Sequence, residues 1–268
     1  MNCQARQKIM LAALTLVLLD FSNGTARAEV PLTNQVLSKV HFVAPPLLPP
    51  GKPSGRQQGG SSRGNCPFTK KPLAAVVPST TQKIRNSRTK NPELAVWDAV
   101  WGLTTSGHPT FIFYVPHALN HNLPIIFVLQ NSAGENIYQT SVKVELPQPG
   151  FVSVSHPTKE KPLGINQFYR WFFVVDCAND SSPLVEGWVQ RTVPNSALSK
   201  SLKNADGRQR VALYAANGIW YDAISTLSDL RRREPKNPEL MADWVSLLES
   251  IGLKEIATEP ITDCCKNR

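Results

Sequence analysis

Between Pro72 and Thr192 the chain is a series of short runs of β-branched and aromatic residues separated by turn residues. The runs are LAAVVP, TFIFYV, LPIIFVLQ, IYQTSVKVEL, FVSVS, FYRWFFVV and LVEGWVQRTV. Such runs are typical of β-strands, and the stretches NSAGEN, QPG and KPLG are typical of turns. Seven short strands with few helix signals predict an immunoglobulin-like β-sandwich over residues 72–195.

Two local features of this region bear on its fold. Gly164 precedes Tyr169, and a tyrosine at the start of a late strand resembles the tyrosine corner of such sandwiches. The stretch PELAVWDAVW, residues 92–101, has apolar residues at helical spacing. We therefore expect a short helix or an irregular insertion at residues 92–101.

The C-terminal part, residues 196–268, carries the strongest periodic pattern. Four positions recur in register after 34 residues: Val211 with Val245, Tyr214 with Leu248, Gly218 with Gly252, and Ala223 with Ala257. This period is typical of tetratricopeptide repeats, and the glycines would let adjacent helices turn tightly. We expect helices near 206–217, 220–233 and 237–251. They should pack on the sandwich, because one and a half repeats cannot bury their own apolar face. The predicted fold class is mainly β plus α.

The first 28 residues have the pattern of a secretory signal peptide. Arg6 and Lys8 precede an apolar run, residues 9–19, and residues 26–28 are Ala-Arg-Ala. This run of 11 residues is shorter than the roughly 20 that a membrane-spanning helix needs. We therefore expect cleavage after residue 28 and export to the periplasm, cell envelope or extracellular space, without an integral membrane segment.

Residues 29–71 form a Pro/Gly-rich basic linker. They include seven prolines and five glycines in 43 positions, too many for a continuous helix or strand. Six basic side chains stand against one acid, Glu29, whereas the two parts that follow are close to neutral. Because the basic excess lies in the linker and not on folded elements, we expect no nucleic-acid partner. An anionic envelope polymer is a possible contact of the linker.

Four cysteines remain after removal of the signal peptide, an even number that suits an oxidising compartment. They are Cys66, Cys177, Cys264 and Cys265. Three pairings are possible, and a Cys264–Cys265 bridge would be strained. Since Cys66 precedes the first predicted strand and Cys177 ends an apolar one, we favour a Cys66–Cys177 disulfide, while the state of the other two cysteines stays open.

Motifs that resemble nucleophilic or metal sites lack the required context. Ser62 lies in a G-x-S-x-G pattern, but no predicted strand precedes it and no helix follows. His117 and His121 have the spacing of zinc ligands, but prolines bracket them and the glutamate of H-E-x-x-H is missing. His108 or His156 would have to complete such a site. We expect no metal and no cofactor.

The carboxylates of the predicted sandwich do not form an obvious catalytic pair. Glycoside hydrolysis needs two acids about 5 to 10 Å apart. Asp176 and Asp180 border the turn CANDSSP, where acids usually bond to the backbone. Glu186 lies on a strand, and we expect an ion pair with Arg170 or Arg191. We therefore expect no catalytic residue, and a hydrolase is the third hypothesis.

Aromatic side chains alternate along two late strands. Tyr169, Trp171 and Phe173 fall on one face of the same strand, and Trp188 lies on the next. Core packing is their ordinary role. If this face points outward, however, the four residues form a platform for sugar rings.

Three consecutive arginines, Arg231, Arg232 and Arg233, fall in the last turn of the middle predicted helix. Their charge is favourable at the negative end of the helix dipole. The same run is a candidate docking site for an acidic partner protein.

Five stretches together resemble a known family. They are GRQQGGSSRGNCP, HPTFIFYVP, FYRWFFVVDC, VEGWVQR, and GIWYDAISTLSDLRR followed by WVSLLESIGL. They are similar to the cyanobacterial exported family called domain of unknown function 928, over about residues 60–262. The resemblance implies a cyanobacterial envelope protein of unestablished activity, and it supplies no catalytic or binding residues.

These observations favour a non-enzymatic exported envelope protein that binds another protein. The sandwich and the helical segment are both common interaction scaffolds, although a fold alone does not prove a function. If the helical segment binds the partner, deletion of residues 206–259 should abolish binding. The alternative is a carbohydrate-binding envelope protein that uses the aromatic platform.

Overall fold

The computed structural model of the protein describes residues 39–46, 54–59, 69–85, 94–118, 124–142, 146–177 and 182–262. All of these belong to one compact unit, Leu37–Arg268. The predicted signal peptide, residues 1–28, lies outside the described residues.

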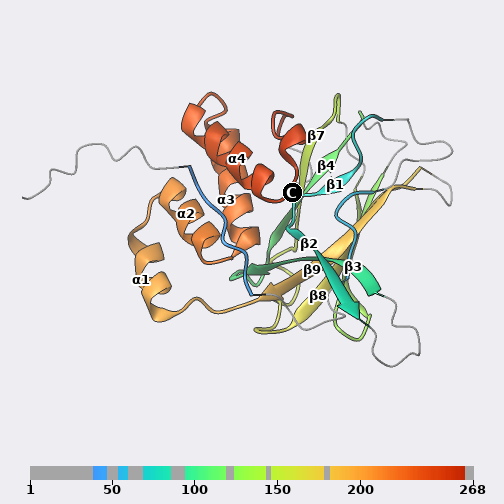
Figure 1. The fold of residues 1–268 in the computed structure, drawn as a ribbon, viewed down its shortest axis with the longest axis horizontal. Helices are drawn as coiled ribbons and strands as arrows, with labels where there is room; N and C mark the ends of the chain where they lie inside the picture. Colours follow the sequence, from blue (N-terminus) through green and yellow to red (C-terminus); the bar gives the residue numbers. More distant parts are fainter. Residues whose placement is uncertain are drawn as a thin grey trace, which may run out of the picture. The chain divides into compact units, whose positions relative to one another are not determined.

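In the described part of the chain the β-strands form two sheets (Figure 1). The strands are β1 (Ala74–Ala75), β2 (Ser79–Arg85), β3 (Leu94–Thr104), β4 (Thr110–Val115), β5 (Ile125–Gln130), β6 (Asn136–Val142), β7 (Gly150–Ser155), β8 (Phe168–Val175) and β9 (Leu184–Arg191). A three-stranded sheet has the order β1-β4-β7, and a six-stranded sheet has the order β2-β3-β9-β8-β5-β6. Strands β3 and β9 pair parallel, and the other neighbours pair antiparallel.

The helices follow the strands in the chain. They are α1 (Ser196–Asn204), α2 (Gly207–Ala216), α3 (Trp220–Arg233), α4 (Pro238–Ser250) and the short 3-10 helix η1 (Lys254–Ile256). The three predicted helices correspond to α2, α3 and α4 within one residue at each end and are confirmed. Helix α1 was not expected. Asn195 caps its N-terminus, because the Asn195 side chain accepts a hydrogen bond from the Leu198 amide.

The three-stranded sheet is covered on both faces. On one face Phe113 of β4 stacks on Phe173 of the six-stranded sheet, with ring centroids 3.9 Å apart. On the other face Tyr114 lies beside Phe151 of β7. The Phe151 ring meets Trp244 of α4 edge-on, with centroids 5.1 Å apart. The three-stranded sheet therefore lies between the six-stranded sheet and the helices.

Helix α3 connects the helices to both sheets. The indole nitrogen of Trp220 donates to the Val76 carbonyl, directly after β1, at 2.7 Å. The Tyr221 hydroxyl accepts from the Trp171 indole at 2.8 Å and donates to the Trp188 carbonyl at 2.9 Å. The helical segment thus shares one core with the strands.

The stretch PELAVWDAVW does not form the expected helix or insertion. Residues Leu94–Thr104 form β3, which pairs antiparallel with β2 from Ser79 opposite Val100 to Arg85 opposite Leu94. The prediction is wrong because cross-strand pairing outweighs a spacing that also fits a strand. Strand β2 was missed because its sequence, STTQKIR, lacks an apolar run.

The structure establishes a mixed β plus α fold with two sheets and with most strands before the helices. The immunoglobulin-like and tetratricopeptide-like descriptions are not confirmed. Two local expectations are met. The Tyr169 hydroxyl accepts from the Gly164 amide at 2.8 Å, as in a tyrosine corner. Gly218 and Gly252 follow helices with φ angles of 72° and 78°.

Candidate functional site

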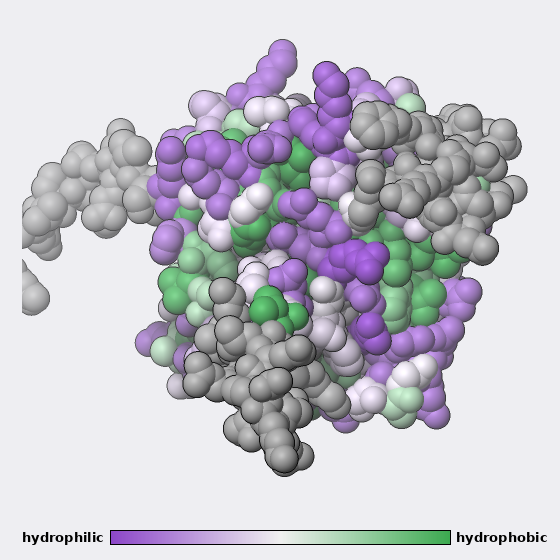
Figure 2. Space-filling model, turned by 45° about the vertical axis from the view of Figure 1, so that its right-hand side comes forward, coloured by the Kyte–Doolittle hydropathy of each residue, from purple (hydrophilic) through white to green (hydrophobic). Residues whose placement is uncertain are grey.

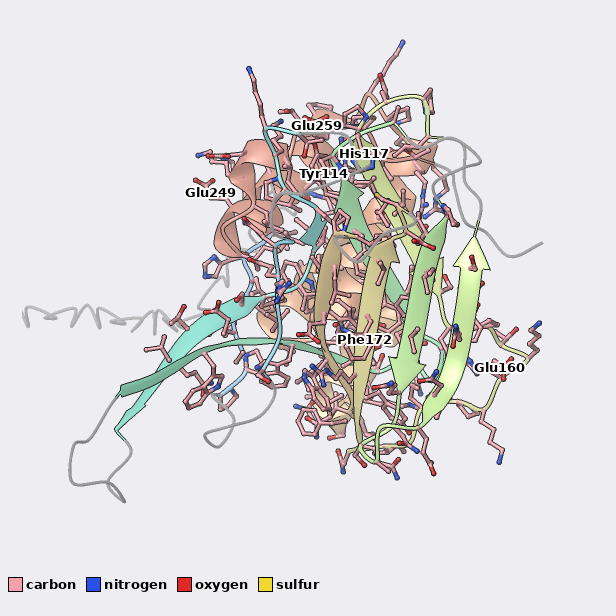
Figure 3. All side chains as sticks on the ribbon, turned by 90° about the vertical axis from the view of Figure 1, so that its right-hand side faces the viewer. Tyr114, His117, Glu160, Phe172, Glu249 and Glu259 are labelled. Carbon is pink, nitrogen blue, oxygen red and sulfur yellow. The ribbon has the colours of Figure 1, made fainter. Side chains whose placement is uncertain are left out.

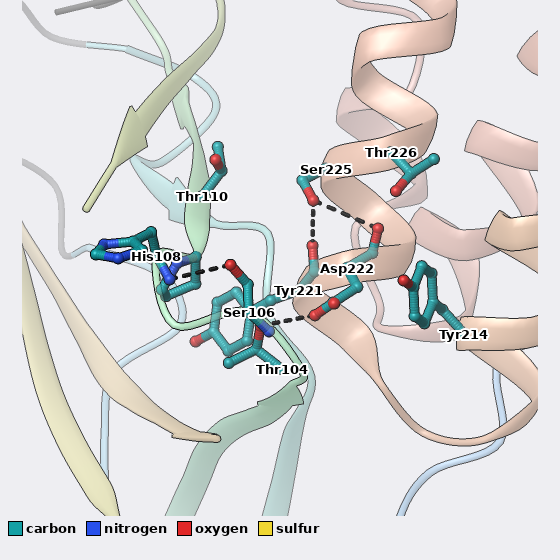
Figure 4. Close-up of a pocket in the computed structure, with 10 residues that line it drawn as sticks. Thr104, Ser106, His108, Thr110, Tyr214, Tyr221, Asp222, Ser225 and Thr226 are labelled. Atoms are coloured by element: carbon teal, nitrogen blue, oxygen red, sulfur yellow. Dashed lines mark hydrogen bonds between the residues drawn. The ribbon is translucent and has the colours of Figure 1, made fainter. Parts of the chain in front are cut away.

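A polar pocket of about 200 Å³ lies where the end of β3 and the turn after it meet α2 and α3 (Figure 4). Its lining residues are Thr104, Ser106, His108, Pro109, Thr110, Tyr214, Tyr221, Asp222, Ser225 and Thr226. Most of them carry a hydroxyl group. The hydroxyls of Thr104, Tyr221 and Ser225 donate hydrogen bonds within the protein, and the recess also holds those of Ser106, Thr110, Tyr214 and Thr226, a type of group that both donates and accepts.

Asp222, in the first turn of α3, holds the turn after β3 in place. Its carboxylate accepts hydrogen bonds from the Thr104 hydroxyl at 2.6 Å, the Thr105 amide at 3.1 Å and the Thr105 hydroxyl. Burial raises the pKa of Asp222, and these donors act in the opposite direction. The carboxylate thus fixes one wall of the pocket to the helix.

Other polar groups of the lining are also held by neighbours. The Ser225 hydroxyl donates back to the Tyr221 carbonyl at 2.6 Å (Figure 4). The Ser106 hydroxyl accepts from the His108 amide at 3.0 Å and so shapes the turn. Burial raises the pKa of Tyr214, and the nearby Asp222 carboxylate adds to this effect. The Tyr214 phenol therefore stays protonated near neutral pH and can donate a hydrogen bond.

His108 stacks on His156 at the edge of the pocket, with ring centroids 5.3 Å apart. Nε2 of His156 lies 2.8 Å from the Lys161 carbonyl, and burial lowers the pKa of His156. His117 is buried elsewhere, and its pKa is lowered for the same reason, while His121 lies outside the described residues. In the described part of the chain no three His, Cys, Asp or Glu side chains lie close enough to hold a metal ion.

The predicted aromatic platform does not form. Tyr169, Trp171 and Phe173 are 7%, 0% and 0% exposed, because this face of β8 packs on the three-stranded sheet. Trp188 is partly exposed on β9. The partly exposed residues of β8 are the alternate ones, among them Phe172 (Figure 3). The platform prediction is therefore wrong for three of its four residues.

The three arginines at the end of α3 do not share one surface. Arg231 is 9% exposed, and its guanidinium lies 5.2 Å from the centre of the Trp244 ring. Arg232 pairs with Asp229. Of the three arginines, Arg233 is exposed. The predicted docking site is thus wrong as a contiguous basic run, because successive helical residues point in different directions.

The remaining candidates that the structure describes are not among the residues lining the pocket. Glu186 pairs with Arg170 at 2.6 Å, which confirms one of the two expected partners. Ser62 and Asp180 lie outside the described residues, and Asp176 follows β8 away from the pocket lining.

Cys177 is 2% exposed and is disulfide-bonded. Its partner lies outside the described residues, as does Cys66. The Cys66–Cys177 pairing therefore stays a prediction, which peptide mapping of the unreduced protein by mass spectrometry can test.

The most exposed large apolar side chains of the described residues come from separate parts of the chain. They are Val43, Val96, Ile165 and Val193. Single apolar residues of this kind are normal for a protein surface. On the face seen in Figure 2, hydrophilic residues cover much of the described surface, and hydrophobic residues gather on its right-hand side.

The pocket was not predicted from the sequence. Its walls come from the end of β3 and from α3, and the Thr104–Asp222 hydrogen bond joins residues 118 positions apart. Threonine and serine near a turn have an ordinary local explanation, so no sequence signal marks them as a site.

The fold and the pocket define a class of protein: a mixed β plus α domain with helices packed on two sheets and a small polar recess between them. The chain belongs to the family described as Domain of Unknown Function (DUF928), whose model matches residues 58–261. No curated protein and no solved structure matches the chain. None of the helices in the described residues is long and apolar enough to cross a membrane.

Proposed function

We propose that this protein is an exported, non-enzymatic binding protein of the cell envelope. Its polar pocket takes a small neutral polyhydroxylated ligand, such as one sugar unit of a glycan. The pocket lining carries the proposal, because it combines many hydroxyl groups with one carboxylate. The signal-peptide pattern of residues 1–28 supports export. We therefore propose the pocket, and not the aromatic platform, as the carbohydrate-binding site.

The chemistry of the lining selects the ligand class. Hydroxyl groups donate and accept, so they match the hydroxyls of a sugar or polyol. Among the described residues that line the pocket, none is a lysine or arginine. Phosphate and carboxylate ligands are usually held by such cations, so a neutral ligand fits better.

The size of the pocket limits the ligand to one small unit. A volume of 200 Å³ holds about six or seven waters at ~30 Å³ each. Pockets for drug-sized ligands are larger, at about 300 to 1,000 Å³. A single sugar ring is of the right scale, and the rest of a glycan would extend into solvent.

We assign Asp222 to holding the pocket wall and not to acid–base chemistry. Its oxygens already accept hydrogen bonds from Thr104 and Thr105. Glycoside hydrolysis uses two carboxylates on either side of the bond that breaks, and the described lining contains one.

Protein binding is the second candidate function. Deleting residues 206–259 would not test it, because this segment supplies fully buried core side chains such as Trp220 and Trp244. A different observation favours it: the helices hold an extended segment of chain in a groove.

The test is a ligand screen on the chain without its predicted signal peptide. Glucose, galactose, mannose, N-acetylglucosamine, glycerol and phosphate are compared by thermal shift, and calorimetry follows for any that bind. At least one neutral sugar should raise Tm in a concentration-dependent way. Tyr214→Phe and Thr226→Val should each weaken its binding about tenfold, the effect of one lost hydrogen bond.

Thr158→Val is the matched control, because Thr158 is exposed and lies outside the pocket lining. It should leave binding unchanged. A shift with phosphate alone, or equal effects of Thr226→Val and Thr158→Val, would contradict the proposal.

A further inference from the structure

The described N-terminal segment, residues 39–46, lies extended against the helices (Figure 1, blue). The Val43 amide donates to the Ala215 carbonyl at the end of α2 at 3.0 Å. The Val40 amide donates to Oδ1 of Asp243 on α4 at 3.0 Å, and the Ser246 hydroxyl donates to the Val40 carbonyl at 2.9 Å. We call the surface formed by Ala215, Asp243 and Ser246, with Trp220 at its base, the peptide groove.

Alternate side chains of the segment enter the peptide groove. Val40 and Phe42 are 4% and 8% exposed. The Phe42 ring meets Trp220 edge-on, with centroids 4.7 Å apart. His41 and Val43 point to solvent. Backbone hydrogen bonds combined with pockets for every second side chain are the usual way in which proteins recognise an extended peptide.

The acceptor in the groove is held in place by the helices themselves. Asp243 is fully buried and accepts from Nε of Arg208 at 2.6 Å and from its Nη2 at 3.2 Å. Arg208 also pairs with Glu239. The carboxylate is thus oriented by α2 and α4 and needs no segment to position it.

The close approach of the segment depends on Gly218. This residue has a φ of 72°, and a Cβ there would lie 3.1 Å from the Val43 carbonyl oxygen and 3.3 Å from Pro45. A glycine at this position therefore serves both the turn after α2 and the room for the segment.

The peptide groove lies within the part of the chain that matches the family model, and the segment lies outside it. The family match covers residues 58–261, which include every groove residue, whereas residues 39–46 lie outside it. We propose that the peptide groove is a docking site for an extended peptide with apolar side chains two residues apart. The chain fills this site with its own segment 39–46. A competing peptide with the same pattern displaces the segment.

The first experiment uses the full chain with a specific protease site inserted between residues 46 and 54. A fluorescent peptide of residues 37–47 is added before and after cleavage, and anisotropy reports binding. We expect at least tenfold tighter binding after cleavage, because the tethered segment has a high effective concentration until it is cut. A peptide with Phe42→Ala should bind at least tenfold more weakly, and one with His41→Ala should bind like the original.

Matched variants of α4 test the receptor side. Ser246→Ala removes the donor to Val40 and should weaken peptide binding several-fold. Ser250→Ala is the control, because the Ser250 hydroxyl donates within its own helix to Leu247. Equal effects of the two variants would overturn the proposal.

Three further results would also overturn it. These are unfolding of the cleaved chain, a folded cleaved chain that loses residues 39–46 and yet does not bind the peptide, and a concentration-dependent dimer, which would make a second copy the occupant.

Hydrogen exchange on the uncut chain gives an independent check. The Val40 and Val43 amides should exchange by local opening, faster than the amides of β4. Exchange of both sets at one rate set by global unfolding would contradict a displaceable segment.

Discussion

The polar pocket and the peptide groove lie on opposite sides of the first turn of α3. Trp220 faces the groove and Asp222 faces the pocket, two residues and roughly 200° apart around the helix axis. The groove buries Val40 and Phe42 of the chain's own segment, whereas the pocket is polar and open. We therefore expect changes on the groove side to cost stability and changes in the pocket to cost binding.

The largest stability effect should come from Trp220→Ala. Trp220 is fully buried and bonds to the Val76 carbonyl, so its loss should lower the free energy of unfolding by about 3 to 5 kcal/mol. Trp188→Ala is the control, because Trp188 is partly exposed, and it should cost less than half as much. Urea unfolding measures both, and similar losses would show that the groove side is not a special source of stability.

Asp243→Asn should have the next largest effect. The change removes the carboxylate from a buried pair with Arg208, which should cost about 3 kcal/mol. Asp229→Asn breaks a pair with Arg232 in which Asp229 is 60% exposed, and it should cost less than about 1 kcal/mol. Equal unfolding midpoints for the two variants would be inconsistent with a buried anchor in the groove.

Gly218→Ala and Gly252→Ala separate turn strain from crowding of the segment. Both glycines have positive φ, but a Cβ at Gly252 would meet nothing within 4 Å. Gly252→Ala should cost about 1 kcal/mol from backbone strain. Gly218→Ala should cost more, because it also crowds Val43 and Pro45, and it should speed exchange of the Val43 amide. An unchanged Val43 exchange rate would argue against the close approach.

The smallest expected effect is a pH dependence from Asp222. Its pKa is raised above the ordinary 3.8 in the folded state, so the folded protein binds this proton more tightly than the unfolded chain does. The contribution of Asp222 to stability should therefore fall as pH rises above about 3.8 through the folded pKa. The unfolding free energy of the wild type minus that of Asp222→Asn should decrease with pH from 4 to 8. A difference that increases with pH would mean that the pKa is lowered.

Patterns within one element were predictable from the sequence. The helices α2, α3 and α4 follow from the pattern that recurs after 34 residues, and Gly218 and Gly252 come after α2 and α4. Residues 92–101 were misassigned, because PELAVWDAVW fits both a helix and a strand. Antiparallel pairing with β2 makes the described part of this stretch a strand. Short-range patterns do not show which distant segment will pair.

The functional surfaces depend on long-range contacts and could not be predicted. Alternation placed Tyr169, Trp171 and Phe173 on one face, but only the position of the second sheet makes that face the inner one. The pocket joins Thr104 to Asp222, and the groove joins Val40 to an acid 203 residues away.

Hydrogen–deuterium exchange with the tightest-binding neutral sugar tests the pocket most directly. We predict added protection at Thr105, at Ser106 and in the first turns of α3, with residues 39–46 unchanged. Protection at β8 and β9 around Trp188, or no change at the pocket under saturating sugar, would contradict a ligand site between β3 and α3.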